Sequence, residues 1–267
     1  MSNHFELTVL GTRGSMPVNG KNFIVYGGAT SCYRIRAGDQ EIYLDAGNGI
    51  LDASIESNTR ITVLLTHMHL DHIIGLPFFA ALGQKNRRVD IYAKSCAGLT
   101  GKEAINRLIA PPFWPLKLEQ YPADVFFHEL PEKNFSLGAV EVDFMEGTHP
   151  LGSTIYRLTH GGKSLVYATD FEHTPEGCDA LARFADGCDI LFYDAQYTDG
   201  EYEKYHGYGH STPSFGLKVG TEANAKKIIL VHHAPQRTDE ELAAMEREFA
   251  AYKDKILFAK TGDKFFF

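Results

Sequence analysis

Apolar residues along this chain fall into short runs rich in β-branched and aromatic side chains, with polar or glycine-containing segments between them. Runs of this length and composition predict strands that are buried in a sheet. We expect strands at residues 5–10, 31–35, 41–45, 61–66, 89–93, 124–130, 139–144, 153–159, 164–169, 189–193, 227–231 and 255–259.

Helical patterns occur in fewer segments, most of them in the second half of the chain. We expect helices at residues 100–110, 178–186, 213–224 and 238–252, and a short one at 73–82. Strands that first follow one another and later alternate with helices predict an α/β (α+β) fold. In that fold two mixed β-sheets pack together and are flanked by helices, as a four-layer αββα sandwich.

The segment 110–116 interrupts these patterns with three prolines and two large aromatic residues, Phe113 and Trp114. Because proline does not fit a regular helix interior, we expect a loop. Phe113 and Trp114 either anchor this loop in the core or form a wall over a ligand site, where an aromatic face could stack on a nucleobase.

Composition describes a globular protein. The chain has 267 residues, and its 44% of hydrophobic residues are enough for a sizeable core. It does not begin with a basic segment followed by an apolar one, and no run approaches the roughly 18 apolar residues of a membrane-spanning helix. We therefore expect a cytoplasmic protein that does not contact a membrane.

The strongest chemical signal follows the apolar run at 61–65, where His67, His69, Asp71 and His72 lie within six residues. In an extended loop, side chains two residues apart point to the same side, so His67, His69 and Asp71 can converge while His72 points elsewhere. Imidazole and carboxylate ligands suit zinc, and also manganese or iron, and no cysteine lies nearby to close a structural zinc site. The segment predicts an open, catalytic metal site.

A centre with two metal ions needs more ligands, and three candidates follow later strand-like runs. His149, Asp170 and His232 each stand beyond the end of such a run. Taken singly, His149 could belong to a turn, Asp170 could cap the next segment, and His232 could be the polar end of a strand. Their shared position favours metal binding.

The pattern HxHxDH at 67–72, followed by His149, Asp170 and His232, resembles the metallo-β-lactamase superfamily, whose fold is an αββα sandwich. The resemblance implies two divalent metal ions, with zinc as the first choice and manganese or iron as alternatives. The implied ligands are His67, His69 and His149 for one ion, Asp71, His72 and His232 for the other, and Asp170 as the bridge. His233 is the alternative to His232. Because the ligands run from residue 67 to residue 232, we expect residues 1–267 to form a single domain.

Two later segments narrow the resemblance to the ribonuclease Z and cyclic-nucleotide phosphodiesterase-like branch. They are 191–197, which contains Asp194, and 208–212, which contains His210. In that branch the histidine is thought to protonate the leaving oxygen while an acid orients it. The resemblance therefore implies His210 as general acid and Asp194 as its partner, although a glutamate is usual there; Asp71 completes the expected catalytic set. His210 could instead be an exposed residue beside a helix start.

The opening segments 10–15, 26–31 and 45–47 are similar to those of small bacterial phosphodiesterase-like members of the superfamily. Arg13, in the glycine-rich first segment, could contact a phosphate or be a solvated turn residue.

Two observations favour a small substrate. Only about twenty residues separate His149 from Asp170, which leaves no room for the long tRNA-gripping arm of similar ribonuclease Z enzymes. The chain has 26 Lys and Arg against 34 Asp and Glu, a formal net charge of −8, whereas polynucleotide binding normally needs a positive surface. We expect a small anionic substrate and no tRNA or other polynucleotide. By analogy the chain could form a homodimer.

Together these features predict a metal-dependent hydrolase, a phosphodiesterase that cleaves a small phosphodiester such as a cyclic nucleotide with a metal-bridged hydroxide. Two divalent ions, Asp71, Asp170 and the hydroxide leave one net positive charge, which suits a phosphodiester anion. One alternative is a glyoxalase II-like thioesterase, which gives no reason for the pair of His210 and Asp194. Others are a β-lactamase, which usually lacks the bridging acid, and a non-catalytic metal-binding sensor.

Overall fold

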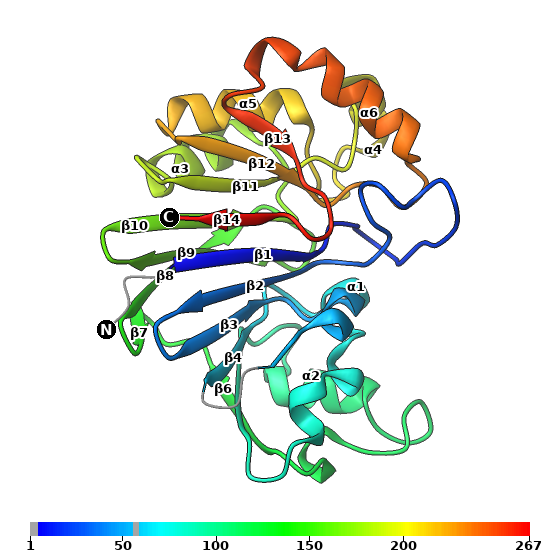
Figure 1. Cartoon of the computed structure of the whole chain (residues 1–267), viewed down its shortest axis with the longest axis vertical. Helices are drawn as coiled ribbons and strands as arrows, with labels where there is room; N and C mark the ends of the chain where they lie inside the picture. The colour runs from blue at the N-terminus through cyan, green and yellow to red at the C-terminus, as the bar shows by residue number, and fades with distance from the viewer. Residues whose placement is uncertain (1–4, 56–58) are drawn as a thin grey trace.

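The computed structural model describes residues 5–55 and 59–267. Two sheets of seven strands face each other in the middle of the molecule, and helices cover their outer faces (Figure 1). The expected α/β (α+β) fold, a four-layer sandwich of two mixed sheets flanked by helices, is confirmed.

Each sheet contains a block of parallel strands, and these blocks decide where the polar residues meet. In order across the first sheet, the strands are β14 (Lys264–Phe266), β1 (Phe5–Gly11), β2 (Cys32–Ala37), β3 (Gln40–Leu44), β4 (Arg60–Leu64), β5 (Arg88–Ala93) and β6 (Asp124–Glu129). The second sheet contains β13 (Ile256–Phe258), β12 (Lys227–Val231), β11 (Ile190–Asp194), β10 (Lys163–Ala168), β9 (Ser153–His160), β8 (Val140–Gly147) and β7 (Phe135–Leu137). Strands β3 to β6 are parallel, and so are β10 to β13.

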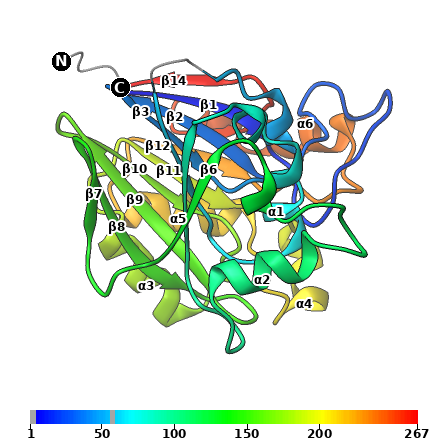
Figure 2. The same cartoon turned by 90° about the horizontal axis from the view of Figure 1, so that it is seen from below.

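The helices lie on the outside of the two sheets. They are α1 (Leu70–Ile73), α2 (Gly101–Leu108), α3 (Pro175–Phe184), α4 (Asp199–Tyr205), α5 (Pro213–Glu222) and α6 (Asp239–Glu248). Short 3-10 helices span Asn48–Asp52, Leu76–Phe78, Ala80–Gly83, Leu118–Gln120 and Ala250–Tyr252. Figures 1 and 2 show α1 and α2 beside the first sheet, and α3, α5 and α6 beside the second. No helix within residues 5–55 and 59–267 has the length and apolar character needed to cross a membrane.

The main core lies between the two sheets, where Leu7, Ile35, Leu165 and Phe192 are fully buried. A second apolar cluster packs between the first sheet and its helices, and a third between the second sheet and α3, α5 and α6. Because the central strands are covered on both faces, they read in the sequence as continuous apolar runs instead of alternating ones. For this reason the positions of the central strands could be predicted from the sequence.

The differences from the expected elements have local causes. Strands β7 and β14 are three residues long, too short for their pattern to stand out, and no residue of α4 is buried, so α4 lacks an apolar face. The expected helix at 73–82 is instead α1 and two 3-10 helices, because Gly75 and Pro77 interrupt it.

The proline-rich loop at 110–116 is held by its tryptophan. Trp114 packs against the apolar cluster of the first sheet, and its Nε1 donates a hydrogen bond of 2.8 Å to the Tyr121 hydroxyl. Phe113 is 74% exposed. Trp114 thus anchors the loop, while Phe113 faces solvent.

Candidate metal centre

The histidines and aspartates singled out in the sequence meet at one edge of the sandwich. His67 follows β4, Asp170 follows β10, Asp194 ends β11 and His232 follows β12. Since β10, β11 and β12 are parallel, their carboxyl ends lie at the same edge. Ligand sites of α/β proteins form at such edges, where the strands end and loops begin.

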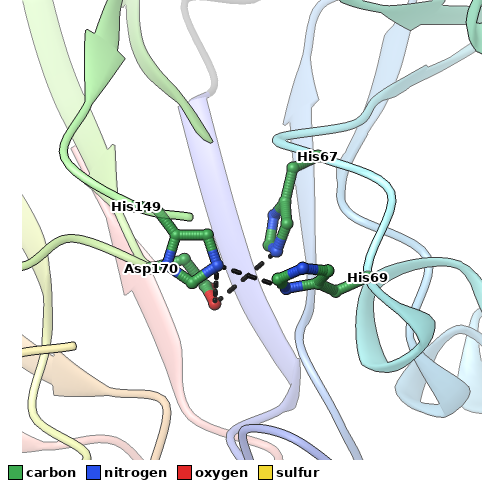
Figure 3. Close-up of side chains that lie close together, drawn as sticks. All are labelled: His67, His69, His149 and Asp170. Carbon is green, nitrogen blue, oxygen red and sulfur yellow. Dashed lines mark hydrogen bonds and ion pairs between the residues drawn. The ribbon is translucent and has the colours of Figure 1, made fainter. Parts of the chain in front are cut away.

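One group of side chains consists of His67, His69, His149 and Asp170, each of which offers an atom within 4.8 Å of the others. Figure 3 shows the three imidazoles turned toward the Asp170 carboxylate. Asp170 Oδ1 lies 3.7 Å from His67 Nε2 and 3.8 Å from His149 Nε2. His149 Nε2 is 3.2 Å from His69 Nδ1. These separations leave space for one cation among the four side chains.

A second group consists of Asp71, His72 and His232, all buried. Asp71 Oδ2 lies 3.2 Å from Nε2 of both histidines. Asp170 also faces this group, but with its other oxygen: Oδ2 is 3.1 Å from His72 Nε2 and 3.2 Å from His232 Nε2. The two oxygens of one carboxylate therefore point to two different groups of ligands.

The ring orientations are fixed by hydrogen bonds behind the groups. His72 donates from Nδ1 to the buried Asp45 carboxylate over 2.7 Å, and His149 donates from Nδ1 to the Gly209 carbonyl over 2.9 Å. In each ring this leaves Nε2 as the lone-pair nitrogen that faces the centre. Asp45 also accepts hydrogen bonds from the Thr66 amide and the Tyr167 hydroxyl.

The buried nitrogen atoms that face the centre are better placed to bind a cation than to form hydrogen bonds with their neighbours. Within residues 5–55 and 59–267, Nε2 of His67 and Nε2 of His72 are buried without a hydrogen-bond partner. Such orphaned polar atoms are rare in folded proteins. Asp45, Asp170 and His232 also have φ values of 59°, 52° and 61°, a left-handed conformation that costs a side-chain-bearing residue energy and is concentrated at functional sites. The residues present therefore fit divalent metal ions.

Charge differs between the two groups. Burial lowers the pKa of His67, His69 and His149, so these imidazoles are neutral and able to coordinate. Burial also disfavours the charged form of His232, but Asp170, Asp71 and Asp194 outweigh it and raise its pKa to about 9.

The two carboxylates that face the second group, Asp71 and Asp170, have pKa values shifted in the opposite direction. Burial acts to raise the pKa of Asp71 and Asp170, but the histidines around them dominate and hold both values below the usual range. The second group is thus rich in negative charge, and it keeps protons that a cation can replace.

Only one of the two adjacent histidines after β12 reaches the centre. His232 lies in the second group, whereas Nε2 of His233 is 3.0 Å from the Ala259 carbonyl oxygen and its ring packs on Phe258. The structure thus places His232, and not His233, where a ligand would stand.

His210 and Asp194 form a close pair beside the two groups. Nδ1 of His210 is 2.9 Å from Asp194 Oδ2, so the aspartate side chain is long enough here. Asp194 also accepts hydrogen bonds from the amides of Asp170, Gln196 and Ser211. With Nδ1 engaged, Nε2 of His210 is the nitrogen free to meet a substrate. The same pair could alternatively join Asp170 and His232 around a cation, since the four lie within 4.8 Å.

Arg13 has a different role from the phosphate contact considered above. Its guanidinium is buried and donates hydrogen bonds to the carbonyls of Gly27, Ala234 and Arg237. Arg13 therefore fixes the segment after His232 and is not available to a phosphate.

The positioning roles of three residues were not predicted from the sequence: Asp45, Glu172 and Gly209. Asp45 stands at the end of β3, at the same edge as the ligands, and this position could have revealed it. Glu172 accepts hydrogen bonds from the Tyr202 hydroxyl and from the amides of Gly207 and Gly209. Nothing in the sequence pattern indicated these contacts.

Comparisons with known proteins place the chain among metallohydrolases. The model of the β-lactamase superfamily domain matches residues 40–233. A ribonuclease Z from Bradyrhizobium sp. (strain ORS 278) is 26% identical and covers 91% of this chain and 94% of its own length. A ribonuclease Z from Nocardia farcinica is 25% identical, with coverages of 92% and 93%.

Solved structures share the fold over almost the whole chain. The metallo-β-lactamase fold protein YhfI from Bacillus subtilis has a TM-score of 0.74 at 20% identity and covers 99% of this chain and 100% of its own. A diphosphatase of the PhnP family has a TM-score of 0.72 at 22% identity, covering 98% of both chains. The short form of human tRNase Z has a TM-score of 0.68 at 17% identity, with coverages of 97% and 98%.

These relatives correct one expectation. The exclusion of tRNA and other polynucleotides is wrong, because the chain's curated relatives are ribonucleases. The net charge of −8 sums over the whole chain and does not describe local charge. One cavity of about 790 Å³ at the start of β4 and β5 is lined by Arg60, Lys85, Arg87 and Arg88 and by one acid, Asp90, which pairs with Arg88, so the local balance is positive in spite of the negative total.

Proposed function

This chain belongs to the metallo-β-lactamase superfamily and is a metal-dependent hydrolase, and on that premise we propose that it cleaves phosphodiesters at a centre of two divalent ions. The first substrate to test is a small phosphodiester such as a cyclic nucleotide. The observation that carries the proposal is the pair of His210 and Asp194 beside the two ligand groups, because it supplies a proton donor for an alcohol leaving group.

The division of the Asp170 oxygens supports two ions. In this assignment His67, His69 and His149 would hold one ion, Asp71, His72 and His232 would hold the other, and Asp170 would offer one oxygen to each. Zinc is the first choice for such nitrogen and oxygen ligands, with manganese or iron as alternatives. Because the ligands come from both sheets, the proposal treats residues 1–267 as one domain.

Divalent ions at this position would supply an activated water nucleophile and neutralise charge on the phosphoryl oxygens. The protein's own side chains do the rest. His210 donates a proton from Nε2 to the leaving oxygen, and Asp194 holds the other ring nitrogen and stabilises the ring. Asp45 keeps the His72 ring in the tautomer that leaves Nε2 unprotonated toward the centre.

Hydrolysis of bis(p-nitrophenyl) phosphate tests the proposal. The purified protein is assayed after chelation and again after Zn²⁺ or Mn²⁺ is added back, with a thioester and a β-lactam measured in parallel. We expect cleavage of the diester that is lost on chelation and restored by metal. Turnover of the thioester alone would assign the chain to the glyoxalase II-like alternative, and metal binding without any turnover would assign it to the sensor.

A second candidate is cleavage of RNA, which the names of the ribonuclease Z relatives favour. Both candidates break a phosphodiester bond with the same groups, so they differ only in the substrate. A precursor tRNA with a 3′ extension, incubated with the metal-loaded protein, separates them. Specific cleavage of that RNA at a rate well above that of cyclic nucleotides would make RNA the substrate.

A further inference from the structure

Three tyrosines form a row that begins at His210. The ring of Tyr197 stands edge-on to the His210 ring, with centroids 5.8 Å apart. Tyr205 stacks on Tyr197 at 4.7 Å with an interplanar angle of 13°, and Tyr208 lies 5.8 Å from Tyr205 at an angle of 88°. We call Tyr197, Tyr205 and Tyr208 the tyrosine row.

Exposure rises along the tyrosine row. Tyr197 is 6% exposed, Tyr205 37% and Tyr208 62%. Packing of the core does not account for this arrangement, because a core aromatic cluster buries all its members. Tyr205 ends α4, which lies at the periphery of the molecule in Figure 2. The exposed members of the row, Tyr205 and Tyr208, thus present aromatic surface to solvent, and the buried Tyr197 connects them to the proposed general acid.

The segment that carries the row is tied to the metal centre. The buried Glu172 carboxylate accepts hydrogen bonds from the Tyr202 hydroxyl and from the amides of Gly207 and Gly209, on either side of Tyr208. The Gly209 carbonyl in turn accepts the hydrogen bond from His149 Nδ1. A side chain at position 209 would place its Cβ 2.1 Å from that nitrogen, so the close approach requires glycine. The tyrosine row is therefore held in a fixed position relative to His149.

We propose that the tyrosine row is a subsite for the leaving group of the substrate, and that this leaving group carries a flat aromatic ring, as a nucleoside does. The inference rests on the proposed function. In hydrolysis the bond between phosphorus and the leaving oxygen breaks, the oxygen of water joins phosphorus, and the proton of His210 passes to the leaving oxygen. The leaving group therefore lies on the His210 side, where the row begins. A nucleobase can stack its π-face on the exposed tyrosine rings, whereas a saturated sugar has no π-face and makes weaker contacts there.

A matched pair of substrates tests the subsite. One is the phosphodiester of methanol with the 5′-oxygen of adenosine, and the other is the same diester of ribose without the base. The leaving oxygen is alike in both, so only the base differs. For the metal-loaded protein we expect kcat/KM to be about tenfold higher for the adenosine diester, with adenosine and methyl phosphate as products.

Variants test whether the preference for the adenosine diester comes from the tyrosine row. Tyr208→Ala is expected to lower the ratio of the two kcat/KM values by about fivefold or more, whereas Tyr208→Phe keeps the ring and the ratio. The control is Tyr252→Ala, which removes another exposed tyrosine, 49% accessible against 62% for Tyr208, that lies shortly before β13 and so at the opposite edge from the centre. A ratio near one for the unaltered protein, an equal ratio in Tyr208→Ala, or release of AMP and methanol would overturn the inference.

Binding of the bare leaving group separates this inference from the proposed function. Calorimetry compares adenosine with ribose on the metal-loaded protein, and no bond needs to be cleaved. If neither diester is hydrolysed but adenosine binds and Tyr208→Ala weakens its binding by about fivefold or more, the subsite stands and the phosphodiesterase proposal fails. If diesters are cleaved but adenosine neither binds nor raises kcat/KM, the phosphodiesterase proposal stands and the subsite fails.

Discussion

The two groups of ligands differ in exposure and in charge. In the group of His67, His69 and His149, the His67 and His149 rings are buried, His69 is exposed as a residue with a partly buried ring, and this burial lowers the pKa of all three imidazoles and keeps them neutral. In the group of Asp71, His72 and His232 every member is buried, and nearby carboxylates raise the pKa of both histidines against the effect of burial. We call these the open group and the buried group.

This difference indicates a division of labour. A cation in the buried group replaces protons and relieves repulsion among buried carboxylates, so we expect it to stabilise the folded protein. A cation in the open group would be bound mainly by neutral nitrogens, and since His69 is exposed we expect a substrate to reach it there. Asp170 belongs to both groups, since each of its oxygens faces one of them.

The largest expected effect comes from removing the charge that the two groups share. Asp170→Asn keeps the size of the side chain, and asparagine tolerates the left-handed backbone at φ 52°. We expect hydrolysis to fall to background, a loss of about a millionfold or more, because the water nucleophile loses its activation. Metal analysis should show loss from both groups. The control is Asp179→Asn, an exposed carboxylate of α3; full metal content in Asp170→Asn would mean that Asp170 is not a ligand.

The next effect separates chemistry from metal binding. His210→Ala should lower kcat by about 10²–10⁴, because the leaving oxygen loses its proton donor. Metal content should stay the same, since the ring engages Asp194 and the ligand groups are complete without it. His128→Ala, on β6, serves as a control outside the centre. Loss of a metal equivalent in His210→Ala would instead favour a ligand role for His210 beside Asp170 and His232.

The sequence revealed this site because its ligands follow strands. The apolar runs before His67, Asp170 and His232 are buried on both faces and easy to recognise, and the carboxyl ends of parallel strands meet at one edge. The strongly patterned strands of the core were predicted for the same reason. The residues at these strand ends therefore indicated a metal site, and the resemblance to the metallo-β-lactamase superfamily implied the full ligand set.

What the sequence did not reveal depends on contacts between distant segments. Glu172 accepts hydrogen bonds from amides more than thirty residues later in the sequence. Arg13 donates hydrogen bonds to carbonyls more than 200 residues later. Helix α4 has no buried face, although Thr198 and Glu201 form the capping box that could have indicated its start. The pairing of Asp170 Oδ1 and Oδ2 with different groups is a matter of tertiary geometry and leaves no trace in the spacing of residues.

The pH dependence of the metal-free protein tests the charge of the buried group. The pKa of His232 is about 9 in the folded protein and about 6.5 in an unfolded chain. A raised pKa stabilises the fold fully below pH 6.5, and this contribution is lost as the pH rises toward 9. We expect the free energy of unfolding of the chelated protein to fall by on the order of 3 kcal/mol across that window from His232, and the raised pKa of His72 adds a loss of the same sign.

The metal-loaded protein is the comparison for that experiment. There a cation takes the place of the proton, so urea unfolding curves should change little between pH 6.5 and 9. The imidazoles of the open group do not interfere, because burial lowers their pKa and they are neutral throughout this window. Equal pH dependence with and without metal would show that the buried group does not exchange protons for a cation.

The smallest expected effect distinguishes the two groups most directly. Among the proposed ligands Asp45 contacts only His72 directly, through the 2.7 Å hydrogen bond to His72 Nδ1, and it reaches His67 of the open group only through the Thr66 hydroxyl. In Asp45→Asn the amide keeps the shape but loses the charge that fixes the His72 tautomer, and outer partners of this kind change metal affinity by about 10–100-fold. We therefore expect one metal equivalent to be lost on dialysis against a weak chelator, while the other stays.

The open group has its own outer partner, which provides the matched test. His149 Nδ1 donates to the Gly209 carbonyl, which Glu172 holds in place through the Gly209 amide. Glu172→Gln should therefore weaken binding of the metal equivalent in the open group. It should leave the equivalent in the buried group, which Asp45→Asn is expected to release. Titration of each variant with Zn²⁺ by calorimetry resolves the two events. If both variants weaken both equivalents to the same extent, the groups are one cooperative unit, and Asp170 couples them more strongly than their difference in burial and charge separates them.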